Sequence, residues 1–240
     1  MIWGNEMAAR LRLFGLAMGA ILAIGVVIAS MASADQLESE TGPVRLTAAQ
    51  EHFFLPPEQG GFTIATDTFL IGGGLLECSS TTYSGTKASA EPTSTFTMTP
   101  SYGACKYGVA TSLESNGCSY LFHINNSGLP PTGGTVDIVC PAGKEMTFTS
   151  IPAQPRCVFH IPPQTGLNGV TYSNIGSGST REITVRVETP VNSLKYSQTP
   201  GVIFKCPAAM KTDGRWWAAF VITGEEDKEG AAAHIGIFLK

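Results

Sequence analysis

Residues 118–140 read CSYLFHINNSGLPPTGGTVDIVC, and this stretch decides the fold. In Cys118–Ile124, apolar side chains occupy every second position and share one face of an extended chain, because side chains alternate along a strand. Thr135–Cys140 shows the same alternation. Asn125–Gly134, which lies between them, is a run of turn-forming residues. The pattern predicts a β-hairpin with one buried face.

The same period of two recurs along most of the chain beyond Phe62, between short runs of glycine, proline, asparagine and serine. Such a pattern is typical of antiparallel β-structure. Further strands are expected at Cys157–Ile161, Arg181–Glu188, Val202–Cys206, Trp216–Thr223 and His234–Leu239. The last two flank a charged turn, Gly224–Gly230, and are expected to pair as a second hairpin.

The number of candidate strands sets the expected architecture. The sequence contains more than ten of them, above the about seven to nine of a single immunoglobulin-like sandwich. The predicted fold class is therefore all-β. We expect an antiparallel β-sandwich stapled by disulfides, built either as one enlarged sandwich or as two packed β-units.

The composition supports a folded protein without a nucleic-acid partner. Of the 240 residues, 43% are hydrophobic and only 14% are charged, which is the opposite of a disordered chain. The formal net charge is −4, so no basic surface that would neutralise phosphates is expected.

The N-terminus has the pattern of a secretory signal peptide. Arg10 and Arg12 precede an uncharged apolar run, Leu13–Ala29, and Ala32 and Ala34 stand in the A-x-A relation that signal peptidase requires. We expect cleavage after Ala34 and a protein located outside the cell or in the cell envelope. The alternative is an uncleaved anchor, since the apolar run approaches the length that spans a membrane.

The mature chain divides into two parts. Residues 35–60 show no sustained period, which predicts a loose N-terminal segment, with a short strand around Val44–Leu46 as the alternative. Residues 61–240 are expected to form the all-β domain, as one β-unit or two.

Six cysteines lie in the mature chain: Cys78, Cys105, Cys118, Cys140, Cys157 and Cys206. An even number in an exported chain predicts three disulfides. No close C-x₂₋₄-C pair is present, which argues against zinc, and no cofactor is predicted. We expect Cys105 to pair with Cys118, Cys140 with Cys157 and Cys78 with Cys206. Pairing of Cys118 with Cys140 is the main rival, because both residues lie at the open end of the predicted hairpin.

Four stretches resemble a family of exported actinobacterial β-proteins that have six cysteines and no assigned function. They read FLIGGGLLECSSTTYSGT (Phe69–Thr86), SNGCSYLFHI (Ser115–Ile124), GTVDIVCPAGKEMTF (Gly134–Phe148) and GVTYSN (Gly169–Asn174). The resemblance covers roughly Phe62–Gly224. It implies export and a β-fold, and it brings no catalytic residue or ligand with it.

Three polar residues define the one candidate catalytic cluster. His123, Asp137 and His160 all have outward parity in their predicted strands, and they would form a metal or acid/base site if these strands adjoin. Two short motifs are interpreted as chance matches. Ser84–Lys87 fits S-x-x-K without its partner motifs, and Leu129–Gly133 fits the sortase pentapeptide but lies far from the C-terminus.

Trp216 and Trp217 form the candidate binding surface. Alternation directs one indole inward and the other outward, where an exposed tryptophan offers a platform for a sugar or a protein. The sequence therefore predicts an exported, non-enzymatic β-protein that acts by surface recognition or in a structural role. A carbohydrate- or ligand-binding module is the alternative, followed by a secreted hydrolase. A glycan or protein partner is expected, and membrane contact only through an uncleaved signal segment.

Overall fold

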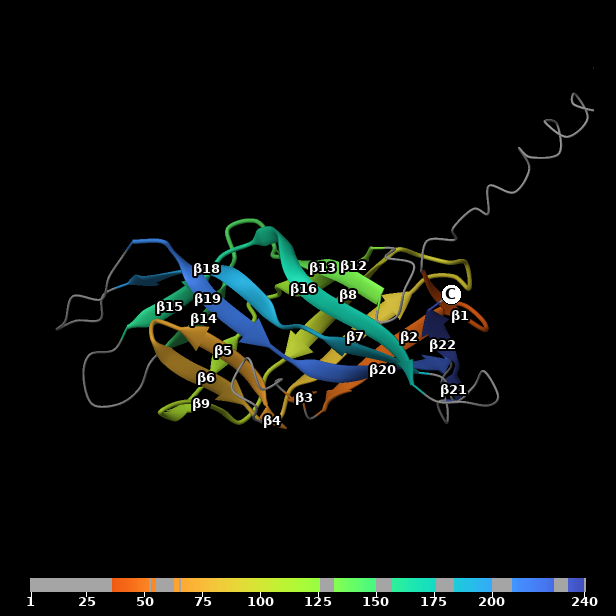
Figure 1. Ribbon diagram of the computed structural model, residues 1–240, viewed down its shortest axis with the longest axis horizontal. Coiled ribbons are helices and arrows are strands. Elements are labelled where there is room, and N and C mark those ends of the chain that lie inside the picture. The colour runs from red at the N-terminus through yellow and green to blue at the C-terminus, as the bar shows by residue number, and fades with distance from the viewer. Residues whose placement is uncertain are drawn as a thin grey trace, which may run out of the picture. The chain divides into compact units, whose positions relative to one another are not determined.

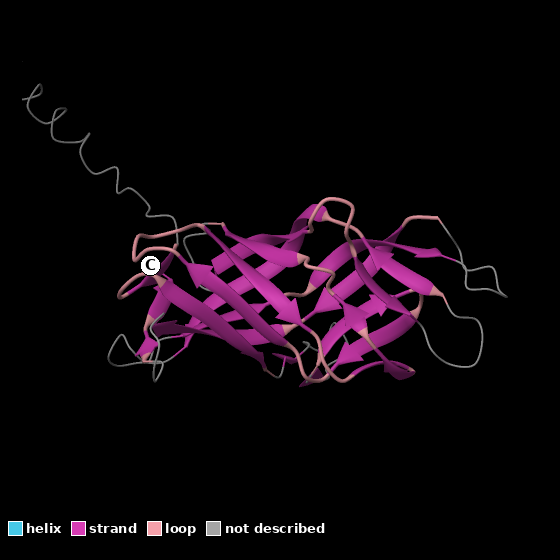
Figure 2. Ribbon diagram, turned by 180° about the vertical axis from the view of Figure 1, so that it is seen from behind, coloured by secondary structure: helices cyan, strands magenta, loops and turns pink. Residues whose placement is uncertain are grey.

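The computed structural model describes residues 36–51, 53–54, 63–64, 66–125, 132–149, 157–175, 184–199, 209–226 and 233–239. Every regular element in these ranges is a β-strand, as Figure 2 shows. All of the strands belong to one compact unit, Ala34–Lys240. The predicted signal peptide, residues 1–34, lies outside the described residues. Within them, no helix has the length and apolar character needed to cross a membrane.

The first large sheet closes on itself. Its antiparallel strands are, in spatial order, β17 (Thr184–Glu188), β16 (Gln164–Ile175), β13 (Thr132–Val139), β12 (Ser119–Ile124), β8 (Thr95–Ser101), β7 (Thr82–Lys87), β2 (Val44–Gln50), β20 (Ala219–Glu226) and β21 (His234–Ile235). Because β17 pairs with β20 as well as with β16, the strands from β17 to β20 form a ring. We call this the closed sheet. Strands in a ring have no free edge.

The second large sheet has the order β10 (Val109–Thr111), β9 (Cys105–Tyr107), β6 (Gly74–Cys78), β5 (Asp67–Ile71), β19 (Lys211–Trp217), β18 (Val191–Thr199), β15 (Val158–Ile161), β14 (Met146–Thr149) and β11 (Leu113–Glu114). The β5–β6 hairpin turns through Gly72 and Gly73, whose φ angles of 62° and 80° suit glycine. Two short ladders complete the fold: β1 (Leu37–Ser39) with β22 (Ile237–Leu239), and β3 (Phe53–Phe54) with β4 (Thr63–Ile64).

The two large sheets are joined by ribbons that pass from one into the other. The β12–β13 pair of the closed sheet continues as the β11–β14 pair of the second sheet. In the same way, β17 and β20 continue as β18 and β19, and Figure 1 shows β19 leading into β20. At that crossing, Thr189 N donates to Ala218 O at 2.9 Å. Each crossing therefore carries backbone pairing across the junction.

The alternating sequence pattern explains the core. In β8 and β12 every second side chain is buried, as the period of two predicts. The inward side chains of both sheets join one hydrophobic cluster, in which Phe69, Tyr120, Phe122, Trp216 and Phe220 are among the largest fully buried residues. The predicted all-β antiparallel fold with packed sheets and disulfides is confirmed, and so is the hairpin of residues 118–140. Closure of one sheet was not predicted.

The N-terminal prediction is wrong. Within the segment 35–60, which was expected to be loose, β2 occupies a central place in the closed sheet between β7 and β20. The alternative, a short strand around Val44–Leu46, falls within β2, which is longer. Val44, Leu46 and Ala48 are buried while Arg45 and Ala49 are exposed, so β2 has the alternation of a half-buried strand. The strands that pair with β2 are separated from it in the sequence, so the residues around β2 alone do not predict its pairing.

The C-terminal strands are broken where single strands were predicted. Trp216–Thr223 divides at Ala218, because the chain leaves the second sheet there and enters the closed sheet. His234–Leu239 divides at Gly236: β21 pairs with β20, as the predicted hairpin requires, whereas β22 pairs with β1. The predicted strand Val202–Cys206 lies outside the described residues.

The disulfide pairing also differs from the favoured prediction. Cys78 pairs with Cys105, and Cys118 pairs with Cys140. The predicted bonds from Cys105 to Cys118 and from Cys78 to Cys206 are therefore wrong, as is Cys140 with Cys157, and the rival Cys118–Cys140 bond is confirmed. Cys78 and Cys105 are opposite each other on the paired strands β6 and β9, and Cys118 and Cys140 flank the paired strands β12 and β13. Strand pairing therefore decides which cysteines meet, and the prediction had relied on hairpins read along the chain. Cys157 is also disulfide-bonded, and Cys206 lies outside the described residues.

Candidate functional site

The two tryptophans of β19 have different environments. Trp216 points inward and is fully buried, where its ring stacks on Tyr120 at 4.4 Å and on Phe69 at 5.9 Å between centroids. Trp217 points to the other face and is partly exposed. The inward set that follows Trp216 is Ala218, Phe220 and Ile222, all buried. Of the two residues proposed as a binding surface, only Trp217 is available for contact.

A buried carboxyl group joins the sheets beneath these tryptophans. Asp67 of β5 is fully buried and accepts a hydrogen bond from Trp216 Nε1 at 2.7 Å. Its second oxygen accepts a hydrogen bond from the Tyr83 hydroxyl of the closed sheet. Burial raises the pKa of Asp67 from 3.8 to about 6, against the lowering effect of the hydrogen bonds from Tyr83 and Trp216. None of the ion pairs among the described residues includes Asp67.

Polar groups lie in register beside Trp217 on the outer face of the second sheet. Trp217 is opposite Thr68, Thr68 is opposite Glu77, and Glu77 is opposite Lys106. Thr68 is itself buried, with its hydroxyl 2.8 Å from that of Thr66. Residues directly opposite in antiparallel strands project to the same side. Lys106 Nζ lies 3.2 Å from Glu77 Oε2, and Arg215, two residues before Trp217, is exposed. The indole thus stands at one end of a row that carries charged groups.

The predicted cluster of His123, Asp137 and His160 does not form. His123 and Asp137 are neighbours on the closed sheet, with 3.0 Å between Nε2 and Oδ2. Asp137 Oδ1 also accepts a hydrogen bond from Gly166 N at 2.7 Å. His160 belongs to β15 of the second sheet and has other partners, so the three strands do not adjoin as the prediction required.

His160 instead lies between a hydroxyl and a carboxylate. Its Nδ1 is 2.5 Å from Glu145 Oε1, and its Nε2 is 2.9 Å from Thr199 Oγ1. Neither partner was proposed from the sequence. Glu145 precedes β14 and Thr199 ends β18, so only the pairing of β15 with both strands brings the three residues together. No group of three or more His, Cys, Asp or Glu side chains able to hold a metal occurs in the described part of the chain.

The two short motifs have no site around them. Ser84 is exposed on β7, whereas Lys87 is buried and donates to the backbone oxygens of Ser89 and Glu91, each at 2.6 Å. The serine and the lysine are therefore on opposite faces of the strand. In the sortase-like pentapeptide, Thr132 is buried at the start of β13, and residues 129–131 lie outside the described residues.

The outer face of the closed sheet carries a row of hydroxyl groups that the sequence analysis missed. Thr223, Thr47 and Ser84 are opposite one another on β20, β2 and β7, and the row continues through Thr99 and Ser119. The T-x-T-x-T alternation of residues 95–99 was the available signal. Hydroxyl groups alone specify no chemistry.

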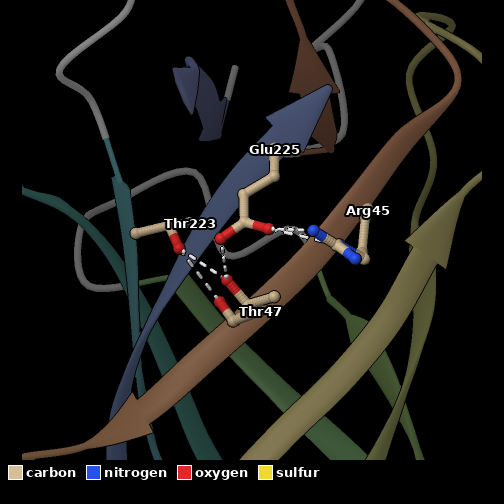
Figure 3. A network of polar contacts seen from close by, with 4 residues as sticks. All are labelled: Arg45, Thr47, Thr223 and Glu225. Atoms are coloured by element: carbon tan, nitrogen blue, oxygen red, sulfur yellow. Dashed lines mark hydrogen bonds and ion pairs between the residues drawn. The ribbon is translucent and has the colours of Figure 1, made fainter. Parts of the chain in front are cut away.

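An ion pair completes this polar face, as Figure 3 shows. Arg45 donates to Glu225 Oε2 from Nε at 3.1 Å and from Nη2 at 2.6 Å. Thr47 Oγ1 lies 3.3 Å from Glu225 Oε1 and 3.0 Å from Thr223 Oγ1. These groups satisfy one another, so the network is a stabilising surface feature rather than a site that awaits a ligand.

Comparison with known proteins supplies no further assignment. No protein-family model matches the chain, and no curated protein and no solved structure is similar to it. The resemblance to exported six-cysteine proteins stays a prediction, and function has to be argued from the described residues.

Proposed function

We propose that the protein is exported and acts by surface recognition at or outside the cell envelope. Disulfide bonds are typical of proteins that fold in an oxidising, extracellular-type environment, and two of them link strands of this fold. The signal-peptide pattern that ends at Ala34 agrees with that environment.

Trp217 is the observation that carries the proposal. Its neighbour Trp216 is held by stacking and by the hydrogen bond to Asp67, so the backbone of β19 is anchored from the inside. An indole on the opposite face of such a strand has only two side-chain torsions to order on binding, which keeps the entropic cost of a contact low. Large aromatic residues are also enriched among the side chains that dominate binding energy.

The groups around Trp217 favour a glycan as the partner. A sugar ring presents an apolar face of C–H groups and a rim of hydroxyls, which suits an indole flanked by hydrogen-bonding side chains. Arg215 on the same strand is exposed and supplies a donor, and the Glu77–Lys106 ion pair lies further along the same outer face. Exported surfaces present glycans in quantity, so recognition there needs no deep pocket.

A binding array with matched variants tests the proposal. The chain from Asp35 onward, which includes every described residue, is applied to glycan and protein arrays. Trp217→Ala is expected to weaken binding to the strongest array ligand at least about tenfold and to lower the thermal midpoint by no more than about 4 °C. Arg45→Ala, on the closed sheet, serves as the control and is expected to bind as the parent chain does. If the ligand found is a protein and Trp217→Ala no longer binds it, the partner is a protein and not a glycan. If Trp217→Ala still binds as the parent chain does, Trp217 is not the binding site.

A further inference from the structure

Outside the proposed binding surface, the group of side chains best arranged for catalysis is the one around His160. We propose that Thr199, His160 and Glu145 form a hydroxyl–imidazole–carboxylate relay that makes Thr199 a nucleophile toward carboxylic esters. This activity is independent of the glycan contact at Trp217. It would make the protein an enzyme, against the expectation from the sequence.

The geometry fixes the roles of the two ring nitrogens. Glu145 Oε1 lies 2.5 Å from Nδ1, and a carboxylate only accepts hydrogen bonds, so Nδ1 carries the ring proton. In the neutral ring, Nε2 is then the acceptor for the Thr199 hydroxyl, 2.9 Å away. A nucleophile within hydrogen-bond reach of a base, which a third group orients, is the arrangement that activates serine and threonine hydroxyls.

The exposure of the three groups suits this role. The side chains of His160 and Glu145 are 19% and 38% exposed, so the base is largely shielded from water, while Thr199 is exposed on the outer face. Thr199 is opposite Val158, and His160 is opposite Ser197, which places the two residues on one diagonal of the β15–β18 ladder. The hydroxyl is therefore accessible from solvent.

The backbone at Glu145 is held by the side chain of Asn116. Asn116 Nδ2 donates to Glu145 O at 2.8 Å and to Thr147 Oγ1 at 3.1 Å. The Cys118–Cys140 disulfide joins the two chain segments that carry Asn116 and Glu145. Glu145 and Asn116 are thus positioning residues, whereas Thr199 and His160 would contact the reacting atoms.

The reaction that this relay supports is acyl transfer to threonine followed by hydrolysis. Thr199 Oγ1 attacks the ester carbonyl carbon while its proton passes to His160 Nε2. The bond between the carbonyl carbon and the alcohol oxygen then breaks, and the imidazolium returns the proton to that oxygen, which leaves as an alcohol. A water molecule then attacks the acyl carbon while its proton passes to His160 Nε2. The bond between that carbon and Thr199 Oγ1 breaks, the imidazolium returns the proton to Oγ1, and the carboxylic acid leaves.

The His123–Asp137 pair offers an internal control. It is also an imidazole–carboxylate pair on an outer sheet face, made through Nε2 of His123 where His160 uses Nδ1. No hydroxyl among the described residues is hydrogen-bonded to the other ring nitrogen of His123. If both histidine–carboxylate pairs only stabilise the surface, substitution of His123 and of His160 will affect ester hydrolysis equally. Only His160 is expected to support acylation.

Covalent labelling and turnover of a small ester test the relay. The chain from Asp35 onward is treated with a fluorophosphonate, and the modified residue is located by mass spectrometry. It is also assayed with p-nitrophenyl acetate. We expect the label on Thr199, no label in Thr199→Val, and label in Thr199→Ser. His160→Gln is expected to lower kcat about a hundredfold or more, and Glu145→Gln to lower kcat with KM unchanged. His123→Gln is expected to match the parent chain.

Three outcomes would overturn the proposal. The first is that the parent chain hydrolyses the ester no faster than Thr199→Val does. The second is that the label is found on another residue. The third is that His123→Gln and His160→Gln lose the same share of the rate. Thermal melting of each variant separates these results from misfolding, and Thr199→Ser keeps the test decisive if Thr199→Val unfolds. Because the variants lie on other strands than Trp217, failure here leaves the glycan proposal standing.

Discussion

The closed sheet and the second sheet use their outer polar residues differently. Both sheets carry ion pairs on their outer faces. These are Arg45–Glu225 and His123–Asp137 on the closed sheet, and Lys106–Glu77 and His160–Glu145 on the second. On the second sheet, Trp217 is partly exposed and Thr199 is exposed next to an oriented imidazole. Polar groups that satisfy one another stabilise a surface, whereas accessible aromatic and nucleophilic groups can act on a ligand. The second sheet is therefore where function is expected.

The junction between the sheets depends on a few buried groups. Tyr83 belongs to the closed sheet, and Asp67 and Trp216 belong to the second sheet, so their hydrogen bonds tie the two together. Tyr83 also stacks on Phe220 at 4.3 Å, and Trp216 stacks on Tyr120. Stability should accordingly be most sensitive at this junction and least sensitive on the outer faces.

Replacement of Trp216 is expected to have the largest effect. Trp216→Ala leaves a cavity between the sheets and removes one donor from Asp67, and large-to-small changes of aromatic core residues cost about 3–5 kcal/mol. Because the buried Asp67 also loses a hydrogen bond, we expect the loss of unfolding free energy to lie at the upper end of that range. Chemical denaturation measures it. Trp217→Ala, the neighbouring control, is expected to cost less than about 1 kcal/mol, and similar losses at both positions would show that Trp217 is also core.

The titration of Asp67 is expected to make the junction pH-dependent. Its pKa is about 6 in the folded protein and 3.8 in its ordinary state, so the unfolded chain loses this proton at a lower pH than the folded one. Below pH 4 the contribution of Asp67 to stability is fully present. It is lost as pH rises from about 4 to 6, and the difference in pKa corresponds to about 3 kcal/mol.

Asp67→Asn isolates this contribution from other carboxyl groups. The amide keeps an acceptor for Trp216 Nε1 and stays neutral at every pH. The free energy of unfolding, measured from pH 4 to pH 7, is expected to fall more steeply for the parent chain than for the variant. Parallel curves for the two proteins would mean that Asp67 has an ordinary pKa and that the junction is hydrated.

Local alternation predicted those parts of the fold that depend only on neighbouring residues. It was sufficient for β12, β13 and β15, whose inward residues follow a period of two. It also places Asp67 on the apolar face with Phe69 and Ile71, which is a sequence signal for the buried carboxyl group. The pattern alone cannot show that β2 pairs with β20, because register between distant strands is decided by the whole buried face.

The candidate relay could not be predicted from the sequence for the same reason. Glu145, His160 and Thr199 come from three separate segments, and only the order β14–β15–β18 brings them together. The sequence prediction chose His160 correctly as an outward residue but paired it with His123 and Asp137, whose strands belong to the other sheet. Parity along a strand shows which way a side chain points, whereas strand order decides what it meets.

The smallest expected effect concerns the ion pairs of the two outer faces. Arg45 makes two contacts to Glu225, whereas Lys106 makes one contact to Glu77 at 3.2 Å. The side chains of Arg45 and Glu225 are 51% and 21% exposed, and those of Lys106 and Glu77 are 60% and 32% exposed. Exposed pairs contribute about 0–1 kcal/mol. Double-mutant cycles with alanine are expected to give a coupling of about 0.5 kcal/mol for Arg45–Glu225 and almost none for Lys106–Glu77. At 1 M salt the first value should fall toward the second, because screening acts on exposed charges. Equal couplings in both sheets would mean that the polar groups of the closed sheet are no better matched than those of the second, which would remove one basis for placing function on the second sheet.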